Sequence, residues 1–344
     1  MFKKLVGNEN VKLTLRRLRE KNRVPNSFLF AGSEGVGKRQ FALELAKGFV
    51  CVNPADGEAC GVCSACLRVD KLQLPKSDDK DTHKRIVFTD HADVGVVMAY
   101  NRNILVDAVR HLESEANFRP FEAAARFFII DDAEKMNDAA SNALLKTLEE
   151  PPATTYIFLI TAQPDALLPT IRSRCQTLRF ASISDEDIER YLMDERAFSP
   201  DEAKLAARLA QGSIGRAVSI DVKQFRERRA RMMNILVNAI EDHNLAALLR
   251  TSEEINDAKN KTSFEEHMDI LQSLIHDVWS LRVTGDAGMV VNTDLTDRLT
   301  SLAQNPGSVA LPAWIAAIDE MRLNLIVNIN RRVATDALFA GMGG

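Results

Sequence analysis

The first half of the chain alternates short apolar runs with amphipathic stretches. Runs rich in apolar and β-branched residues predict strands at 27–31, 85–89, 126–130, 156–161 and 176–180. Helical patterns lie between these runs. This alternation predicts an α/β fold in which helices cover both faces of a mostly parallel sheet.

Two of the predicted helices are sharply delimited. The first begins at Lys38, directly after a glycine-rich turn, and runs to about Val50. The second spans 137–150: Asn137 or Asp138 serves as its N-cap, and the pair Pro151-Pro152 stops it. The first turn of the helix at Lys38 therefore faces whatever the glycine-rich turn holds.

Strand patterns end after Phe180. Capped helix starts near Ser184 and Ser199, followed by the turn at 211–213, predict a small helical lid over 181–221. Amphipathic patterns at 225–240, 263–281 and 311–339 then predict an all-helical domain over 222–344, and loops are expected at 75–84 and 284–292. The sequence thus predicts three domains, of which the first spans 1–180.

Composition and charge narrow the class of protein. The chain has 344 residues, 46% of them hydrophobic and 27% charged, which excludes a mostly disordered chain. The chain has a formal net charge of -4 and so lacks the excess of basic residues that a stand-alone nucleic-acid-binding protein usually carries. No apolar run is long enough to cross a bilayer and no secretory pattern is found, so we expect a cytoplasmic protein without membrane contact.

The glycine-rich turn has the pattern of a phosphate-binding loop. Gly32, Gly35 and Gly37 precede Lys38, between an apolar strand and a helix. In such loops backbone N–H groups surround phosphate oxygens and the lysine reaches the terminal phosphates. The next position normally carries Ser or Thr as a Mg²⁺ ligand, but Arg39 stands here and its guanidinium cannot bind a cation. The loop either binds ATP or ADP or is only a strand-to-helix turn. Mg²⁺ binding is doubtful, and hydrolysis is expected to be weak or absent.

An acidic pair at the end of the strand over 126–130 has the pattern of the second half of an ATPase site. Asp131 would hold Mg²⁺ through water, and Asp132 stands where a water-activating glutamate is usual. The aspartate reaches one methylene less far, which disfavours a role as general base. Glu134, two residues further on, is a misplaced substitute for it. Acidic residues that merely finish a strand are the alternative interpretation.

Four cysteines form a cluster that predicts a structural metal site. Cys51, Cys60, Cys63 and Cys66 follow the spacing C-x8-C-x2-C-x2-C within the insert 51–66. Cysteines two residues apart can converge on one tetrahedral Zn²⁺, and disulfides are disfavoured in a reducing compartment. Four small buried hydrophobic residues or a reactive dithiol are the alternatives.

Together these motifs resemble bacterial clamp-loader subunits of the AAA+ family. The resemblance rests on the phosphate loop, the cysteine insert, the pair Asp131-Asp132, the run 142–152 (NALLKTLEEPP) and the run 168–175 (LPTIRSRC). It implies an AAA+ fold with a helical lid and a C-terminal helical collar. It further implies that Arg174 reaches into a neighbouring subunit's ATP site as an arginine finger and that Arg216 is a sensor for a nucleotide bound in cis.

This chain differs from the family's motor subunits at two positions that take part in ATP hydrolysis. Motor subunits have threonine and glutamate where this chain has Arg39 and Asp132, which favours the stator class, delta-prime. The resemblance implies a five-membered ring with motor (gamma/tau) and delta subunits that places the sliding clamp on primed DNA. Two alternatives stay open: a hydrolysing motor subunit, and a zinc-stabilised interaction module without a nucleotide role. The basic stretches 16–21 and 226–231 are interpreted as solvated helix faces more readily than as DNA contacts.

Overall fold

The computed structural model describes residues 2, 5–55, 58–76, 78–257, 263–326 and 330–343. The chain forms two compact units, each considered by itself. Unit 1 comprises Met1–Ala197 and Ala210–Val218, and unit 2 comprises Phe198–Leu209 and Ser219–Gly344. The phosphate loop, the acidic pair and the cysteine cluster all lie in unit 1.

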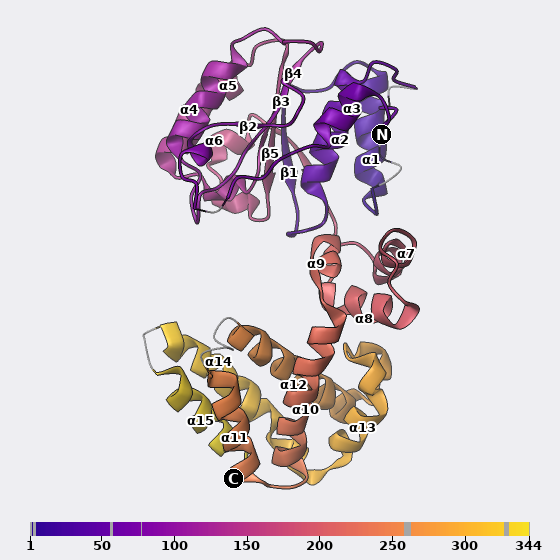
Figure 1. Cartoon of the computed structure of the whole chain (residues 1–344), viewed down its shortest axis with the longest axis vertical. Coiled ribbons are helices and arrows are strands. Elements are labelled where there is room, and N and C mark those ends of the chain that lie inside the picture. Colours follow the sequence, from indigo (N-terminus) through magenta and orange to yellow (C-terminus); the bar gives the residue numbers. More distant parts are fainter. Residues whose placement is uncertain are drawn as a thin grey trace. The chain divides into compact units, whose positions relative to one another are not determined.

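A six-stranded sheet forms the centre of unit 1, with the order β2-β3-β4-β5-β1-β6. Figure 1 shows strands β1 to β5 of this sheet among the helices of the unit. All neighbouring strands are parallel except β2 and β3, which are antiparallel. The strands are β1 (Ser27–Ala31), β2 (Val87–Phe88), β3 (Val94–Val97), β4 (Arg126–Ile130), β5 (Thr155–Thr161) and β6 (Gln176–Arg179). The parallel arrangement brings the carboxyl ends of β1, β3, β4 and β5 to one edge of the sheet, where the site is built.

Helices cover both faces of the sheet because alternate residues of the central strands enter two separate cores. Phe28 and Phe30 of β1 pack in one core, whereas Leu29 between them packs in the other. The first core includes side chains from α1 (Glu9–Glu20), α2 (Lys38–Val50) and α3 (Ser64–Val69). The second includes side chains from α4 (Val106–Ala116), α5 (Asp138–Glu149) and α6 (Pro169–Arg172). The helix α7 (Asp185–Arg196) follows, and α9 (Ile214–Ser219) lies mostly in unit 1.

The sheet differs from the sequence-based prediction at its edge. The strand expected at 85–89 is reduced to Val87–Phe88, and β3 was not predicted. Its four residues include Gly95, and an ideal Cβ there would lie 2.3 Å from a methyl carbon of Ile86. Close packing against the preceding segment therefore requires glycine inside a strand too short to show a period of two.

The described residues of unit 2 form helices joined by turns, and no strand. Its helices are α8 (Pro200–Ala210), α10 (Val222–Ile240), α11 (Leu245–Asn256), α12 (Phe264–Thr284), α13 (Thr296–Gln304), α14 (Leu311–Ile326) and α15 (Arg331–Met342). One buried core joins α10 to α15. None of the helices placed in either unit is both long and apolar enough to cross a membrane.

The single amphipathic helix expected at 311–339 is wrong, because α14 and α15 are separate helices. Residues 327–329 lie outside the described part of the chain, and Asn330 begins a new helix. The Asn330 side chain accepts hydrogen bonds from the backbone N–H groups of Arg332 and Val333. Such an N-cap is a start signal that apolar periodicity alone does not reveal. The loop expected at 284–292 also begins with the last residue of α12 and includes a short 3₁₀ turn at Ala287–Met289.

Candidate functional site

The glycine-rich turn joins β1 to α2 at the carboxyl edge of the sheet, as a phosphate-binding loop does. Lys38 is the first residue of α2 and is 6% exposed. Its ammonium group folds back on the loop, donating to the carbonyl oxygens of Gly32 and Ser33, the latter at 2.7 Å. Burial lowers the pKa of Lys38, while nearby carboxylates, Glu134 foremost, oppose that shift. The Lys38 ammonium, which would bind phosphate oxygens in a nucleotide complex, is thus hydrogen-bonded to carbonyl oxygens of the loop itself.

A segment at the start of α9 packs directly on the loop. The Gly215 N–H donates to the Gly35 carbonyl oxygen at 2.9 Å. Gly35 has a φ of +74°, and an ideal Cβ there would lie 2.1 Å from the Ser213 hydroxyl oxygen. Both the left-handed backbone and the close approach require glycine at this position. Arg216 is exposed, and its backbone N–H donates to the Ser213 hydroxyl at 3.2 Å.

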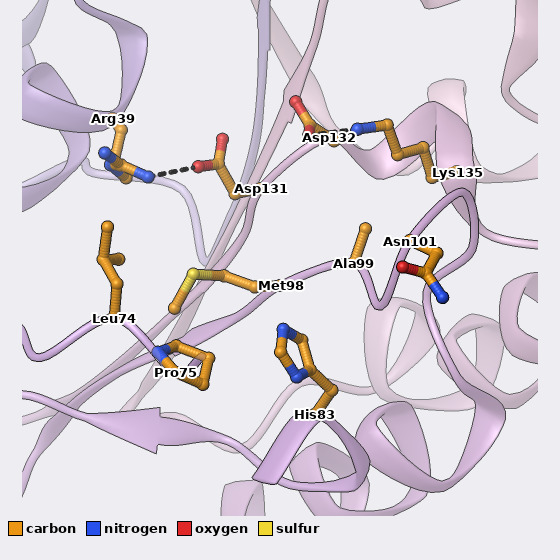
Figure 2. Close-up of a pocket in the computed structure, with 10 residues that line it drawn as sticks. All are labelled: Arg39, Leu74, Pro75, His83, Met98, Ala99, Asn101, Asp131, Asp132 and Lys135. Atoms are coloured by element: carbon orange, nitrogen blue, oxygen red, sulfur yellow. Dashed lines mark hydrogen bonds and ion pairs between the residues drawn. The ribbon is translucent and has the colours of Figure 1, made fainter. Parts of the chain in front are cut away.

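Arg39 forms an ion pair with Asp131 where an ATPase would place its magnesium ion. The two residues approach from α2 and from the end of β4, and the Arg39 Nη1 donates to Asp131 Oδ2 at 2.9 Å. Burial raises the pKa of Asp131, and the Arg39 charge acts against that shift. Figure 2 shows the guanidinium pointing at the carboxylate. The carboxylate that should orient a hydrated cation is already bonded to a cation of the chain itself.

The second acidic residue is neutralised in the same way. Asp132 has a left-handed backbone with a φ of +54°, and its Oδ2 accepts from the Lys135 ammonium at 2.7 Å. Glu134, in the short turn after β4, accepts from the Ala162 N–H at 3.2 Å through one oxygen. Its other oxygen is buried and has no hydrogen-bond partner among the described residues. Asp132 is thus held by a lysine and does not stand free to activate water.

An open cavity of about 370 Å³ lies beside these two ion pairs (Figure 2). Its walls combine the ends of β3 and β4 with the segment that follows α3. The lining residues are Arg39, Leu74, Pro75, His83, Met98, Ala99, Asn101, Asp131, Asp132 and Lys135. Both charged pairs border this cavity, so each acid in its wall already has a basic partner.

The four predicted cysteines converge in space. Their sulfur atoms all lie within 4.8 Å of one another, and the Sγ atoms of Cys51 and Cys60 are 3.5 Å apart. All four are free thiols in the structure. Four sulfurs placed about 2.3 Å from one tetrahedral Zn²⁺ are separated by roughly 3.8 Å. The donor set and the spacing therefore fit a structural zinc ion. Cys66 lies on α3 and Cys51 at the end of α2, so the cluster joins two helices.

Arg174 lies outside the phosphate-loop cluster, just after α6. Its side chain is 33% exposed, and its Nη1 donates to the Thr170 carbonyl oxygen at 2.9 Å. Its Nη2 donates to Glu149 Oε1 at 2.6 Å. The adjacent Cys175 is buried, and burial raises the pKa of its thiol to about 12. Cys175 is not one of the four clustered cysteines.

The structure brings the sequence-predicted loop and acidic residues to one edge of the sheet, but it also contains partners that the sequence analysis missed. Lys135 pairs with Asp132, and Glu149 pairs with Arg174. The first pair has the i,i+3 spacing that could have indicated it, whereas the second joins residues twenty-five positions apart.

The fold and the site define a P-loop protein of the AAA+ class, with a phosphate loop, an acidic pair and a cysteine insert on one parallel sheet. A family model described as "DNA polymerase III, delta subunit" matches residues 7–184. The chain is 30% identical over 312 residues to the DNA polymerase III subunit delta' of Bacillus subtilis, covering 90% of this chain and 88% of that protein. It is 28% identical over 317 residues to the delta' subunit of Escherichia coli, covering 91% and 87% of the two chains. The chain belongs to the DNA polymerase III delta-prime family of clamp-loader subunits.

A solved structure of a gamma subunit-related protein from Thermotoga maritima is also similar. Its TM-score is 0.44 at 19% sequence identity, and the match covers 96% of this chain and 98% of that one.

Proposed function

We propose that this chain is the stator of a clamp loader: a subunit that completes a neighbour's ATP site with Arg174 and hydrolyses little or no ATP itself. It assembles with motor (gamma/tau) and delta subunits and helps to place a sliding clamp on primed DNA. Family membership and the composition of the site support this proposal. Within it, residues 181–221 act as the lid and residues 222–344 as the collar through which the subunits associate.

The Arg39–Asp131 ion pair is the observation that carries the proposal. Hydrolysis in P-loop ATPases needs Mg²⁺ held by a hydroxyl after the loop lysine and oriented by the acid at the end of the strand. Here the first position holds a cation and the second is bonded to it at 2.9 Å. A divalent ion entering this site would have to separate the pair and lie beside a guanidinium, which Coulomb repulsion disfavours.

Arg174 supports the donor half of the proposal. A guanidinium stays charged at any physiological pH and presents a planar fork of donors, which suits it to phosphate recognition. The Arg174 side chain is partly exposed, beside a short helix whose start is fixed by Pro169. It can therefore be presented to a second subunit without any exposure of the core.

The zinc ion belongs to the proposal as a structural element. Cys51, Cys60, Cys63 and Cys66 would hold it, and no position is left open for a substrate. Its role is to tie the end of α2 to the start of α3.

The experiment that tests the proposal compares ATP hydrolysis by the purified chain alone, by motor and delta subunits without it, and by the reconstituted assembly. We expect the chain alone to show no Mg²⁺-dependent turnover and the assembly to hydrolyse faster than the partners do. Brisk hydrolysis by the isolated chain would identify a motor subunit instead. A chain without effect on its partners would be an interaction module.

Substituting Arg39 with threonine is expected to restore the missing magnesium ligand. Equilibrium binding of a fluorescent ATP analogue should then be about tenfold tighter in Mg²⁺ than in EDTA, a difference of about 1.4 kcal/mol. The unmodified chain should show no such difference, because its own guanidinium bonds Asp131. Arg39→Lys keeps the positive charge and is the matched control, and it should remain insensitive to Mg²⁺. A wild-type chain whose binding collapses in EDTA would show that Arg39 does not exclude the ion.

A further inference from the structure

Arg174 is bonded to a carboxylate of its own chain. Its Nη2 lies 2.6 Å from Oε1 of Glu149, the last residue of α5. We propose that Glu149 is a positioning residue that holds Arg174 at rest on this subunit and yields it to a neighbour's nucleotide triphosphate. The inference rests on the proposed role of Arg174 and adds a control on when that role is exercised.

The contacts of the guanidinium show how it is restrained. One terminal nitrogen donates to the Thr170 carbonyl oxygen at 2.9 Å and the other to Glu149. The first nitrogen also lies 3.5 Å from the Ser173 hydroxyl oxygen. These acceptors together restrain the guanidinium on the surface of unit 1. Phosphate oxygens bind an arginine through the same N–H donors that a carboxylate uses. Arg174 therefore has to leave Glu149 before both terminal nitrogens can bind phosphate oxygens.

The location of Glu149 indicates that its carboxylate is not there to stabilise the helix. The C-terminal end of a helix carries partial negative charge, so a glutamate at the last position is unfavourable for α5 itself. Arg174 is the basic residue that forms an ion pair with Glu149 in the described part of the chain. The neighbouring Arg172 forms an ion pair with a different acid, Asp165, at 2.6 Å. Arg172 and Arg174 therefore do not share a carboxylate.

The exposure of the pair sets the size of the effect. The side chains of Arg174 and Glu149 are 33% and 49% exposed. Solvent-exposed pairs contribute at most about 1 kcal/mol, which corresponds to roughly fivefold in an equilibrium constant. A triphosphate, which carries more negative charge than one carboxylate, can outcompete Glu149. The restraint is therefore weak enough to be broken whenever the neighbouring site is filled and closed.

The test is the ATPase of the full assembly reconstituted with Glu149→Gln. The amide keeps the size of the side chain and removes the charge that competes with phosphate. Without clamp and DNA, kcat/KM for ATP should rise about three- to fivefold. With both added, the variant should match the wild type, so that the stimulation by clamp and DNA shrinks by the same factor. A gain of activity is a result that a merely structural role of Glu149 would not produce.

Glu150→Gln is the matched control, since it removes the same charge one residue further along. Glu150 is exposed, and within the described residues the ion pair of Arg174 is with Glu149, so the Glu150 variant should behave as the wild type. The inference is overturned if Glu149→Gln leaves kcat/KM unchanged or lowers it, or if both variants raise it equally. If Arg174→Ala itself has no effect on the assembly, the proposed function fails, and that outcome is separate from a failure of the restraint alone.

Discussion

Replacing Arg174 with alanine is expected to slow hydrolysis at the neighbouring subunit's ATP site by about 10³-fold or more, the range in which arginine fingers act in other NTPases. The rate falls because the charge that develops on the transferred phosphoryl group loses its fixed counter-charge. The rate at this one site is measured by single-turnover hydrolysis in an assembly whose other ATP sites are inactivated by substitution of their own loop lysine. ATP binding at the same site should change far less than turnover.

Two variants make the experiment specific to Arg174. Arg172→Ala removes an equally exposed arginine two residues earlier that is paired with Asp165, and it should leave turnover within about twofold of the wild type. Arg174→Lys keeps the charge but loses the planar fork, so an intermediate rate is expected. Equal loss in the variants at 172 and 174 would mean that the segment matters for assembly and that Arg174 has no chemical role of its own.

The parts of the fold that could be predicted are those whose residues face two cores at once. The strands β1 and β4 were predicted with the bounds 27–31 and 126–130 that the structure shows. Each is a continuous apolar run, because alternate side chains fill the cores on the two faces of the sheet. The edge strand β3 was missed, since four residues with an internal glycine do not show a period.

The residues at the loop and at the end of β4 could be named from the sequence, but the pairing of their charges could not. The sequence shows that Arg39 replaces a metal-binding hydroxyl, whereas its ion pair with Asp131 joins positions far apart in the chain. The same holds for Arg174 and Glu149, which are brought together by the packing of α5 and α6. No local period encodes such contacts, because they depend on how two elements are placed on the sheet.

At the carboxyl edge of the sheet, charged side chains are paired with groups of the chain itself. Asp131 and Asp132, the acids that would attract a divalent cation, are each bonded to a basic side chain of the chain itself. Lys38, which would meet phosphates, is bonded to loop carbonyls. Each acid at this edge therefore already has a basic partner, whereas hydrolysis in P-loop ATPases requires Mg²⁺ at the equivalent acids.

Removing the metal from the cysteine cluster is the second change for which we expect a large effect. The protein as purified should contain one Zn²⁺ per chain, bound by Cys51, Cys60, Cys63 and Cys66. Structural zinc contributes about 10 to 16 kcal/mol of apparent binding free energy in small zinc-finger peptides. Here we expect much of that free energy to stabilise only the insert 51–66, because α2 and α3 are also held by packing in the core of the sheet.

Loss of zinc should therefore unfold the insert locally rather than the whole unit. Cys66→Ser, or treatment with a strong chelator, is expected to accelerate amide hydrogen exchange by at least tenfold over 51–70 and at the C-terminal end of α2. Exchange at β4 should stay protected, since its own apolar side chains are fully buried in the cores on the two faces of the sheet. Metal content by elemental analysis and exchange by mass spectrometry give the two readouts.

Cys175→Ser provides the control for the zinc experiment, because it removes the buried cysteine that lies outside the cluster. That variant loses some stability from burying a hydroxyl but should retain a full equivalent of zinc. A wild-type chain that carries no zinc, and whose exchange over 51–70 is unaffected by the chelator, would show that the four thiols simply pack together. Local unfolding at the C-terminal end of α2 after loss of zinc would also bear on the phosphate loop. The same helix begins at Lys38, ends at the residue before Cys51 and carries Arg39 in its first turn.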